Sequence, residues 1–210
     1  LSRGAPPPET IAAELIAKEF NPTKIIETNP DVLAYKGSGI GGQNFIGYGP
    51  LRENLAQQHG VSDRRIVTAA GGMNSISLWM DYLRQKHTEA GSASRQRPTI
   101  ATEVPTYDRF PVNALNRGFG WLPIEIGADG QPDLDRLEAY AKNGVVEGAY
   151  LIPEGQNPTG NTYTAETRAR IAEIASKHGL QVLYDAAYWN LTYHGRINDV
   201  VRSPSENVTW

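Results

Sequence analysis

The chain has 210 residues and no cysteine, and its 20 basic and 23 acidic residues give a net charge of −3 at pH 7. The length suits one large domain, or one domain with appendages. The charge offers no basic surface for nucleic acid, and the lack of cysteine excludes disulfides, thiol nucleophiles and Cys-ligated zinc. No apolar run approaches the ~20 residues of a membrane helix. We therefore expect a cytoplasmic protein that acts on small molecules, without nucleic acid, membrane or metal as a partner.

The first fifty residues form the first predicted region. A proline-rich opening leads into a predicted helix at residues 8–20, which Asn21 and Pro22 end. Six glycines between Gly37 and Gly49 then mark an irregular loop, and we expect its backbone to approach a ligand or a neighbouring chain. We assign residues 1–50 to an N-terminal arm, a helix and this Gly-rich loop.

Helices and strands alternate after residue 51. The order begins with a helix at residues 51–59, a strand at 65–69 and a helix at 73–86 that turns Ile76, Trp79, Met80 and Leu83 inward. Further strands are predicted at 99–104, 120–126, 148–152 and 181–184, with helices at 107–117, 134–142 and 165–178 between them. Thr164 and Gly179 suit the two ends of the last helix. This alternation predicts a three-layer α/β/α domain over residues 51–210, built on a mostly parallel sheet.

Candidate binding residues follow the predicted strands, where ligands sit in open sheets of this kind. The turn of Gly71, Gly72, Met73 and Asn74 opens a helix, so its free amides and the helix dipole favour a phosphate. Two glycines at such a junction also suit an ordinary turn. Tyr107, after the strand at 99–104, could lie against a flat ring or simply pack at the strand end.

Two later strands carry further polar residues at their ends. Asn157 lies in a Pro-rich turn, where its amide could bond a phenolic oxygen or merely serve the loop. Asp185 ends an apolar strand, and Tyr188 follows at helical spacing. A carboxylate there could hold a proton on a pyridine nitrogen, whereas the alternative is an aspartate that caps a short helix. Taken together, these groups come in the order that one bound pyridoxal phosphate requires.

Four motifs carry a family resemblance, which covers nearly the whole chain from residue 51. They are Gly47–Glu53, Glu103–Asp108, Gln156–Gly160 and Asp185–Tyr188. With them the chain resembles the fold-type I pyridoxal-phosphate aminotransferases of class I/II, and most closely the 2-aminoadipate and multi-substrate aminotransferases. The resemblance implies amino-group transfer between an amino acid and a 2-oxo acid, and a homodimer with shared active sites.

The resemblance also implies a role for each candidate residue. Gly72, Met73 and Asn74 would bind the cofactor phosphate, Tyr107 would stack on the ring, and Asp185 would partner its nitrogen. Asn157 and Tyr188 would partner the phenolic oxygen. Gly4 and Asn157 would lie near the substrate carboxylate. No catalytic residue is assigned.

The family's Schiff-base lysine has no counterpart in these 210 residues. The six lysines, at positions 18, 24, 36, 86, 142 and 177, lack its sequence context, and those at 86, 142 and 177 fall on predicted helices with solvated faces. We therefore expect the sequence to be part of a longer enzyme and to be inactive by itself. The alternatives are another pyridoxal-phosphate enzyme, such as a lyase, decarboxylase or oxidase, and a non-catalytic effector-binding domain.

Overall fold

The chain is described by a computed structural model that covers residues 12–28, 30, 46–89, 97–189 and 207–209. It forms two compact units, Leu1–Ala70 and Gly71–Trp210, which are described separately below. The predicted division between an N-terminal region at residues 1–50 and an α/β/α domain at residues 51–210 stays a prediction.

Helices make up the regular structure of the first unit. They are α1 (Ala13–Glu19), α2 (Pro22–Thr28), α3 (Gly49–His59) and the short 3-10 helix η4 (Asp63–Arg65). The predicted first helix ends as expected, but a second helix begins at once, at Pro22. Proline suits the first helical position, and the Asn21 side chain accepts a hydrogen bond from the Lys24 amide (3.1 Å). The residues that we took as a helix end therefore also start the next helix.

The strand expected at residues 65–69 is absent from the described structure. Arg65 ends η4, and residues 66–69 continue as irregular, partly extended backbone. Two backbone hydrogen bonds hold this segment, from the Thr68 amide to the Ile46 carbonyl (2.9 Å) and from the Ile66 amide to the Asp63 carbonyl (3.0 Å). The prediction was wrong because β-branched residues favour a strand only when a neighbouring strand pairs with them.

Gly47 allows this close approach of residues 46 and 68. Its φ is +113°, and a Cβ at this position would lie 1.8 Å from Thr68 Oγ1. A side chain would need both a disfavoured backbone conformation and space that Thr68 occupies. Part of the glycine pattern in this motif is therefore explained by packing within the first unit.

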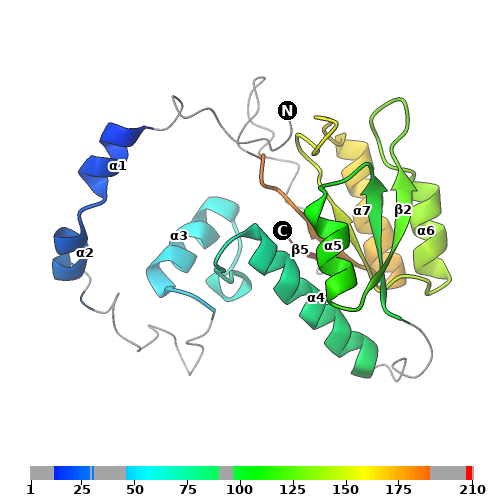
Figure 1. Cartoon of the computed structure of the whole chain (residues 1–210), viewed down its shortest axis with the longest axis horizontal. Helices are drawn as coiled ribbons and strands as arrows, with labels where there is room; N and C mark the ends of the chain where they lie inside the picture. Colours follow the sequence, from blue (N-terminus) through cyan, green and yellow to red (C-terminus); the bar gives the residue numbers. More distant parts are fainter. Residues whose placement is uncertain (1–11, 29, 31–45, 90–96, 190–206, 210) are drawn as a thin grey trace. The chain divides into compact units, whose positions relative to one another are not determined.

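A parallel sheet forms the centre of the second unit (Figure 1). Its strands are β1 (Thr99–Val104), β2 (Gly120–Glu125), β3 (Gly148–Leu151), β4 (Gln181–Tyr184) and β5 (Val208–Thr209). Their order across the sheet is β2-β1-β3-β4-β5, and every neighbouring pair is parallel. All five carboxyl ends therefore meet at one edge.

Helices cover both faces of this sheet. On one face, α4 (Gly72–Glu89) and α5 (Arg109–Asn116) form a core with inward side chains of the strands; its members include Ile76, Trp79, Met80, Leu83, Ile100, Phe110, Tyr150 and Leu183. On the other, α6 (Leu134–Lys142) and α7 (Ala165–His178) form a second core, which includes Leu137, Ala149, Leu151, Ile171, Ile174 and Val182. We call these the α4–α5 face and the α6–α7 face. The predicted α/β/α architecture is confirmed.

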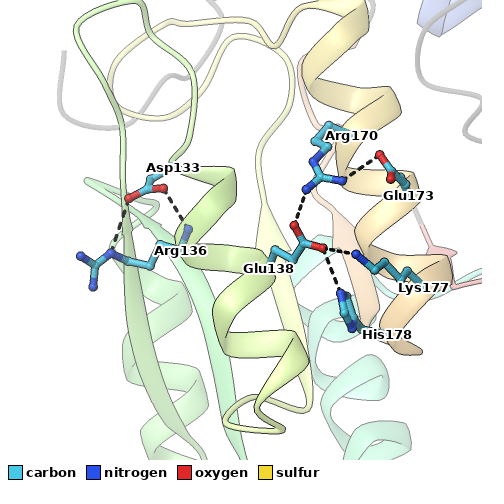
Figure 2. A network of polar contacts seen from close by, with 7 residues as sticks. All are labelled: Asp133, Arg136, Glu138, Arg170, Glu173, Lys177 and His178. Carbon is cyan, nitrogen blue, oxygen red and sulfur yellow. Dashed lines mark hydrogen bonds and ion pairs between the residues drawn. The ribbon is translucent and has the colours of Figure 1, made fainter.

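Local signals define the two ends of α7, and polar contacts join α7 to α6; Figure 2 shows the contacts between the two helices. Thr164 Oγ1 accepts a hydrogen bond from the Thr167 amide (3.1 Å), and Gly179 takes the left-handed conformation with φ of 67°, as predicted for the two ends of α7. Glu138 of α6 accepts hydrogen bonds from Arg170, Lys177 and His178 of α7. The Lys177 and His178 bonds lower the pKa of Glu138 to about 2. One carboxylate thus binds three cationic or ionisable groups along α7.

Among the helices that the structure describes, none has both the length and the apolar character needed to cross a lipid bilayer. The described residues also include no cluster of three or more His, Asp and Glu side chains placed to hold a metal ion.

Candidate functional site

Three loops of the second unit meet at the carboxyl edge of the sheet. Tyr107 follows β1, Asn157 follows β3, and Asp185 and Tyr188 follow β4. Since β1, β3 and β4 are neighbours in the sheet, these loops are neighbours as well. The parallel topology therefore brings together residues that lie as far as 81 positions apart in the chain.

Helix α4 begins at the same edge. Near its end, His87 Nδ1 lies 2.6 Å from Oε1 of Glu147, the residue immediately before β3. A Cβ on Gly148 would lie 2.9 Å from Trp79 Cζ2, so glycine lets the later part of α4 pack closely on the start of β3. Because the end of α4 lies beside the amino end of β3, its first residues lie toward the carboxyl end.

The first turn of α4 is suited to an anion. The first amides of a helix lack intrahelical acceptors, and the helix dipole adds positive potential there. The Asn74 and Ser75 amides turn back to the Gly71 carbonyl, at 2.9 and 3.0 Å. No described atom lies within 4 Å of where a Cβ on Gly71 or Gly72 would be. No described side chain therefore covers the turn at these two glycines.

A tyrosine of the central strand orients Asp185. The Tyr150 hydroxyl donates to Asp185 Oδ2 (2.6 Å), and the Phe110 ring stacks on Tyr150 with centroids 3.9 Å apart and 4° between the planes. Burial and the nearby Asp185 charge raise the pKa of Tyr150 far above its ordinary value, so the hydroxyl remains a donor. In the described part of the chain no donor reaches Asp185 Oδ1. This half-buried carboxylate is thus held by one oxygen and keeps the other available.

Tyr188 lies against the loop that carries Asn157. A Cβ on Gly155 would come within 3.3 Å of Tyr188 Cβ, so the glycine, with φ of +50°, makes room for this tyrosine. The Asn157 amide and the Tyr188 hydroxyl are half-buried, and neither bonds to another described residue. Both polar groups can therefore meet a ligand without first breaking a described contact.

Tyr107 and Met73 complete the described site. Both are partly buried and pack against the hydrophobic core of the α4–α5 face. The Tyr107 carbonyl accepts a hydrogen bond from the Phe110 amide (3.0 Å), which ties it to the start of α5. Both interpretations of Tyr107 fit this position, because a ring packed at the strand end also borders the edge where Asp185 and Asn157 lie.

Glu103 is a buried carboxylate on the α6–α7 face of the same edge. Its Oε1 accepts a hydrogen bond from the Tyr163 hydroxyl (2.5 Å), and its Oε2 accepts one from the Ile152 amide (3.0 Å). Burial raises the pKa of Glu103 to about 7, although these two hydrogen bonds lower it in part. Glu103 thus fixes the end of β3 to the end of β1, directly below the loop of Asn157.

Arg168 and Glu154 form a buried ion pair beside Glu103. Arg168 Nη1 contacts Glu154 Oε1, and the guanidinium also donates to the carbonyls of Tyr163 (3.3 Å) and Pro153 (3.1 Å). Both side chains are at most 2% exposed. This pair anchors the first residues of the Asn157 loop to α7.

Sequence reasoning missed several of these residues. Tyr150 lies in the short buried strand β3 and resembles an ordinary core tyrosine. Its bond to Asp185 follows from the register of β3 and β4, which pairs Tyr150 with Leu183 and places Asp185 two residues further on the same face. Glu103 carried a signal, since the single charged residue in a predicted central strand requires partners when buried.

The remaining predicted positions lie elsewhere. Gly4 falls outside the described residues, so its predicted role stays a prediction. Lys86, Lys142 and Lys177 are exposed on α4, α6 and α7, as expected of solvated faces. Each lies in the last turn of a helix that returns to the amino end of the sheet, opposite the site.

Comparison with known proteins gives the family. The sequence model of the aspartate amino-transferase family matches residues 72–203. The 2-aminoadipate transaminase of Thermus thermophilus is 30% identical over 147 residues, which are 70% of this chain and 34% of that protein. An uncharacterized HTH-type transcriptional regulator of Bacillus subtilis is 29% identical over 157 residues, covering 70% of this chain and 32% of the regulator.

Solved structures agree with the fold. The crystal structure of LysN, an alpha-aminoadipate aminotransferase from Thermus thermophilus, was solved with N-(5'-phosphopyridoxyl)-L-leucine. It matches with a TM-score of 0.66 and 26% identity, covering 86% of this chain and 42% of LysN. The chain thus spans about a third to two fifths of the length of these relatives.

The parallel sheet, the polar groups at its carboxyl edge and these matches define one class. The chain belongs to the aspartate amino-transferase family, whose fold is that of the fold-type I pyridoxal-phosphate enzymes. The resemblance first drawn from four short motifs is confirmed.

Proposed function

We propose that the protein transfers an amino group between an amino acid and a 2-oxo acid, with pyridoxal 5'-phosphate as its cofactor. The observation that supports this most directly is the half-buried Asp185 carboxylate, held by Tyr150 with one oxygen still without a described partner. An unneutralised carboxylate at a site edge is costly without a cationic partner, and a protonated pyridine ring supplies one.

The residues present fit this cofactor. The open first turn of α4, with Gly72, Met73 and Asn74, would bind the phosphate. Tyr107 would lie against the ring and fix its plane, and Asp185 would accept a hydrogen bond from the protonated ring nitrogen. Asn157 and Tyr188 would bond the phenolic oxygen, since their polar groups are available at the neighbouring loops. When bound, pyridoxal phosphate provides an electron sink that stabilises negative charge on the substrate α-carbon.

The side chains around Asp185 set how well it performs this task. The Tyr150 hydroxyl directs the carboxylate and stays protonated because its pKa is raised. The carboxylate in turn keeps a proton on the ring nitrogen by a charge-assisted hydrogen bond. Phe110 holds Tyr150 in place by stacking. Tyr150, Phe110 and Asp185 together would therefore keep the proton on the ring nitrogen of the cofactor.

We extend the proposal to substrates, assembly and location. Gly4 and Asn157 would lie near the substrate carboxylate, the protein would act as a homodimer, and its location would be the cytoplasm. These points rest on the family resemblance, which names the substrates of the protein only as an amino acid and a 2-oxo acid.

The test combines a mass, a spectrum and a turnover assay. In a chain that includes the family's Schiff-base lysine, we expect a chromophore between roughly 300 and 500 nm that remains after unbound pyridoxal phosphate is removed, and borohydride treatment should attach the cofactor mass to that lysine. Amino donors and 2-oxo acids should then exchange amino groups. Carbon dioxide release or oxidation of the donor instead would assign a decarboxylase or an oxidase.

The similarity to a regulator supports a second candidate, a non-catalytic effector-binding domain. This alternative predicts cofactor or amino-acid binding without turnover of any donor and acceptor pair. Turnover above the rate without protein would exclude it.

A further inference from the structure

Gln156 is buried, although its two neighbours in the loop after β3 are only half-buried. Its side chain is 1% exposed, whereas the neighbouring Gly155 and Asn157 are half-buried. A buried primary amide is unfavourable unless its donors and acceptors are bonded. The partners of Gln156 therefore show what the residue holds in place.

The Gln156 amide joins two loops of the candidate site. Its Nε2 donates to the Pro105 carbonyl (2.7 Å), which lies 51 positions earlier in the chain and two residues before Tyr107. Its Oε1 accepts from the Thr159 amide (2.9 Å) and the Thr159 hydroxyl (2.7 Å). One side of the amide thus binds the Tyr107 loop, and the other binds the loop of Asn157.

The backbone of Gln156 closes the same loop. Its amide donates to the Asn161 carbonyl (2.8 Å), and its carbonyl accepts from the Gly160 amide (2.5 Å). Asn157 lies inside this closed turn, and its own side chain bonds to no described residue. The position of the Asn157 amide is therefore set by its backbone, which Gln156 holds.

We propose that Gln156 is a positioning residue that sets the distance between Tyr107 and Asn157 across the ring of the bound cofactor. This inference rests on the proposed function. Gln156 touches neither cofactor nor substrate; it acts through the two loops that do. Misplacement by about 1 Å weakens an oriented contact strongly, so loss of this link should lower ring recognition far more than phosphate recognition.

Gln131 offers a matched control. Its Nε2 donates to the Thr162 carbonyl (3.3 Å), and its Oε1 accepts from the Thr164 amide (3.0 Å) and the Thr167 hydroxyl (2.8 Å). It makes the same kinds of bonds as Gln156 but joins the turn before α6 to Thr162 and the start of α7, and it does not contact the Tyr107 loop. Gln131→Met and Gln156→Met therefore each remove one donated and two accepted hydrogen bonds, although Gln131 is half-buried and Gln156 is buried.

The experiment measures binding of pyridoxamine 5'-phosphate, which needs no covalent bond to a lysine. Protein fluorescence on the full chain would report its Kd, and inorganic phosphate would be titrated as a probe of the α4 turn. We expect Gln156→Met to raise the Kd for pyridoxamine phosphate about 10- to 30-fold and to leave phosphate affinity within about twofold. Gln131→Met should change neither Kd by more than about twofold.

A double variant tests whether Gln156 acts through Asn157. If it does, the Kd for pyridoxamine phosphate should rise in the double variant Gln156→Met with Asn157→Ala by much less than the product of the two single-variant rises. Gln156→Asn keeps the amide but shortens it, and it serves the same comparison if Gln156→Met does not fold.

Two outcomes would overturn the role of Gln156. One is equal loss of pyridoxamine phosphate binding in the Gln131 and Gln156 variants, which would mean a general stability effect. The other is full multiplication of the Gln156 and Asn157 effects. Absence of pyridoxamine phosphate binding to the unaltered protein would instead overturn the proposed function, and the positioning role with it.

Discussion

At the carboxyl edge of the sheet, the two faces differ in how deeply their polar side chains are buried and in the hydrogen bonds that these side chains make. On the α4–α5 face, Asp185 is half-buried, and its Oδ1 has no partner among the described residues. On the α6–α7 face, Glu103 and the Arg168–Glu154 pair are buried, and the two Glu103 oxygens and the Arg168 guanidinium are hydrogen-bonded. One face leaves groups available for a ligand, and the other uses charge to hold the loops.

This contrast distinguishes function from support among similar residue types. The number of partners does not by itself separate the faces, because Glu154 Oε2 is buried without a partner in the described part of the chain. The difference lies in exposure: Asp185 is half-buried and can meet a ligand, whereas Glu154 is fully buried. The difference predicts that changes on the α4–α5 face reduce activity, while changes on the α6–α7 face reduce stability.

Asp185→Asn should give the largest effect on the α4–α5 face. Asparagine can still accept the Tyr150 hydrogen bond, so the free energy of unfolding should change by less than about 1 kcal/mol. The lost charge should lower the rate of amino transfer about 10³-fold, as expected when a preorganised electrostatic partner is removed. Turnover assays on a chain that includes the Schiff-base lysine, with urea unfolding of the same preparation, would check this. A rate within tenfold of the unaltered protein would contradict the role given to Asp185.

Arg168→Met should give the largest effect on the other face. It leaves Glu154 buried without its cation, at a cost of about 3–5 kcal/mol in the free energy of unfolding. Urea unfolding measures this change. The double variant Arg168→Met with Glu154→Leu should recover most of the loss, because no uncompensated charge remains. If the single variant lost less than about 1 kcal/mol, the ion pair would not anchor the loop.

Glu103 should make stability depend on pH. Its pKa rises from the ordinary 4.5 to about 7 on folding, so the folded chain binds the proton more tightly than the unfolded chain. The resulting stability is fully present below about pH 4.5 and is lost as pH rises through about 7; its size is about 3 kcal/mol.

Unfolding between pH 4.5 and 8 would test this, with Glu103→Gln expected to lack the slope. Glu138→Gln is the control, since the pKa of Glu138 is lowered to about 2 and its contribution is lost only as pH falls toward that value. An equal slope in Glu103→Gln and the unaltered protein would assign the pH dependence to another group.

The Glu138 contacts should matter least, although they are numerous. They lie between α6 and α7 (Figure 2), where Arg170 and Lys177 remain partly exposed, so that water and salt screen these contacts. We expect Glu138→Gln to lower Tm by at most about 2 °C, and the difference should shrink at high salt. Thermal unfolding at two salt concentrations measures it. A fall above 5 °C would show that exposed charges support this face as strongly as buried ones.

Much of the fold could be predicted because local patterns and long-range packing agree. The apolar spacing in α4 is met by burial of Ile76, Trp79, Met80 and Leu83, and the end signals of α7 are both used. The predicted strand at residues 65–69 was wrong, since strand formation needs a partner that local sequence does not reveal. The N-terminal helix was predicted as one and is followed directly by a second at Pro22.

The candidate site divides in the same way. Tyr107, Asn157, Asp185 and Tyr188 could be selected because each follows a predicted strand or turn, and the structure brings their loops to one edge. The contacts of Tyr150 and Gln156 could not be predicted, because they join residues 35 and 51 positions apart. Such contacts depend on strand order and register, which alternation of elements alone does not specify.

The sequence by itself determined the class of fold, the family and the identity of the groups at the strand ends, because these follow from residue type and local spacing. Only the tertiary structure decided which polar groups bond to other parts of the fold and which can bond to a ligand. Strand order sets the neighbours of each loop, register sets the face of each side chain, and burial sets the energetic need for partners. For this reason Asp185 and Glu103, both acids at the carboxyl ends of strands, are assigned different tasks.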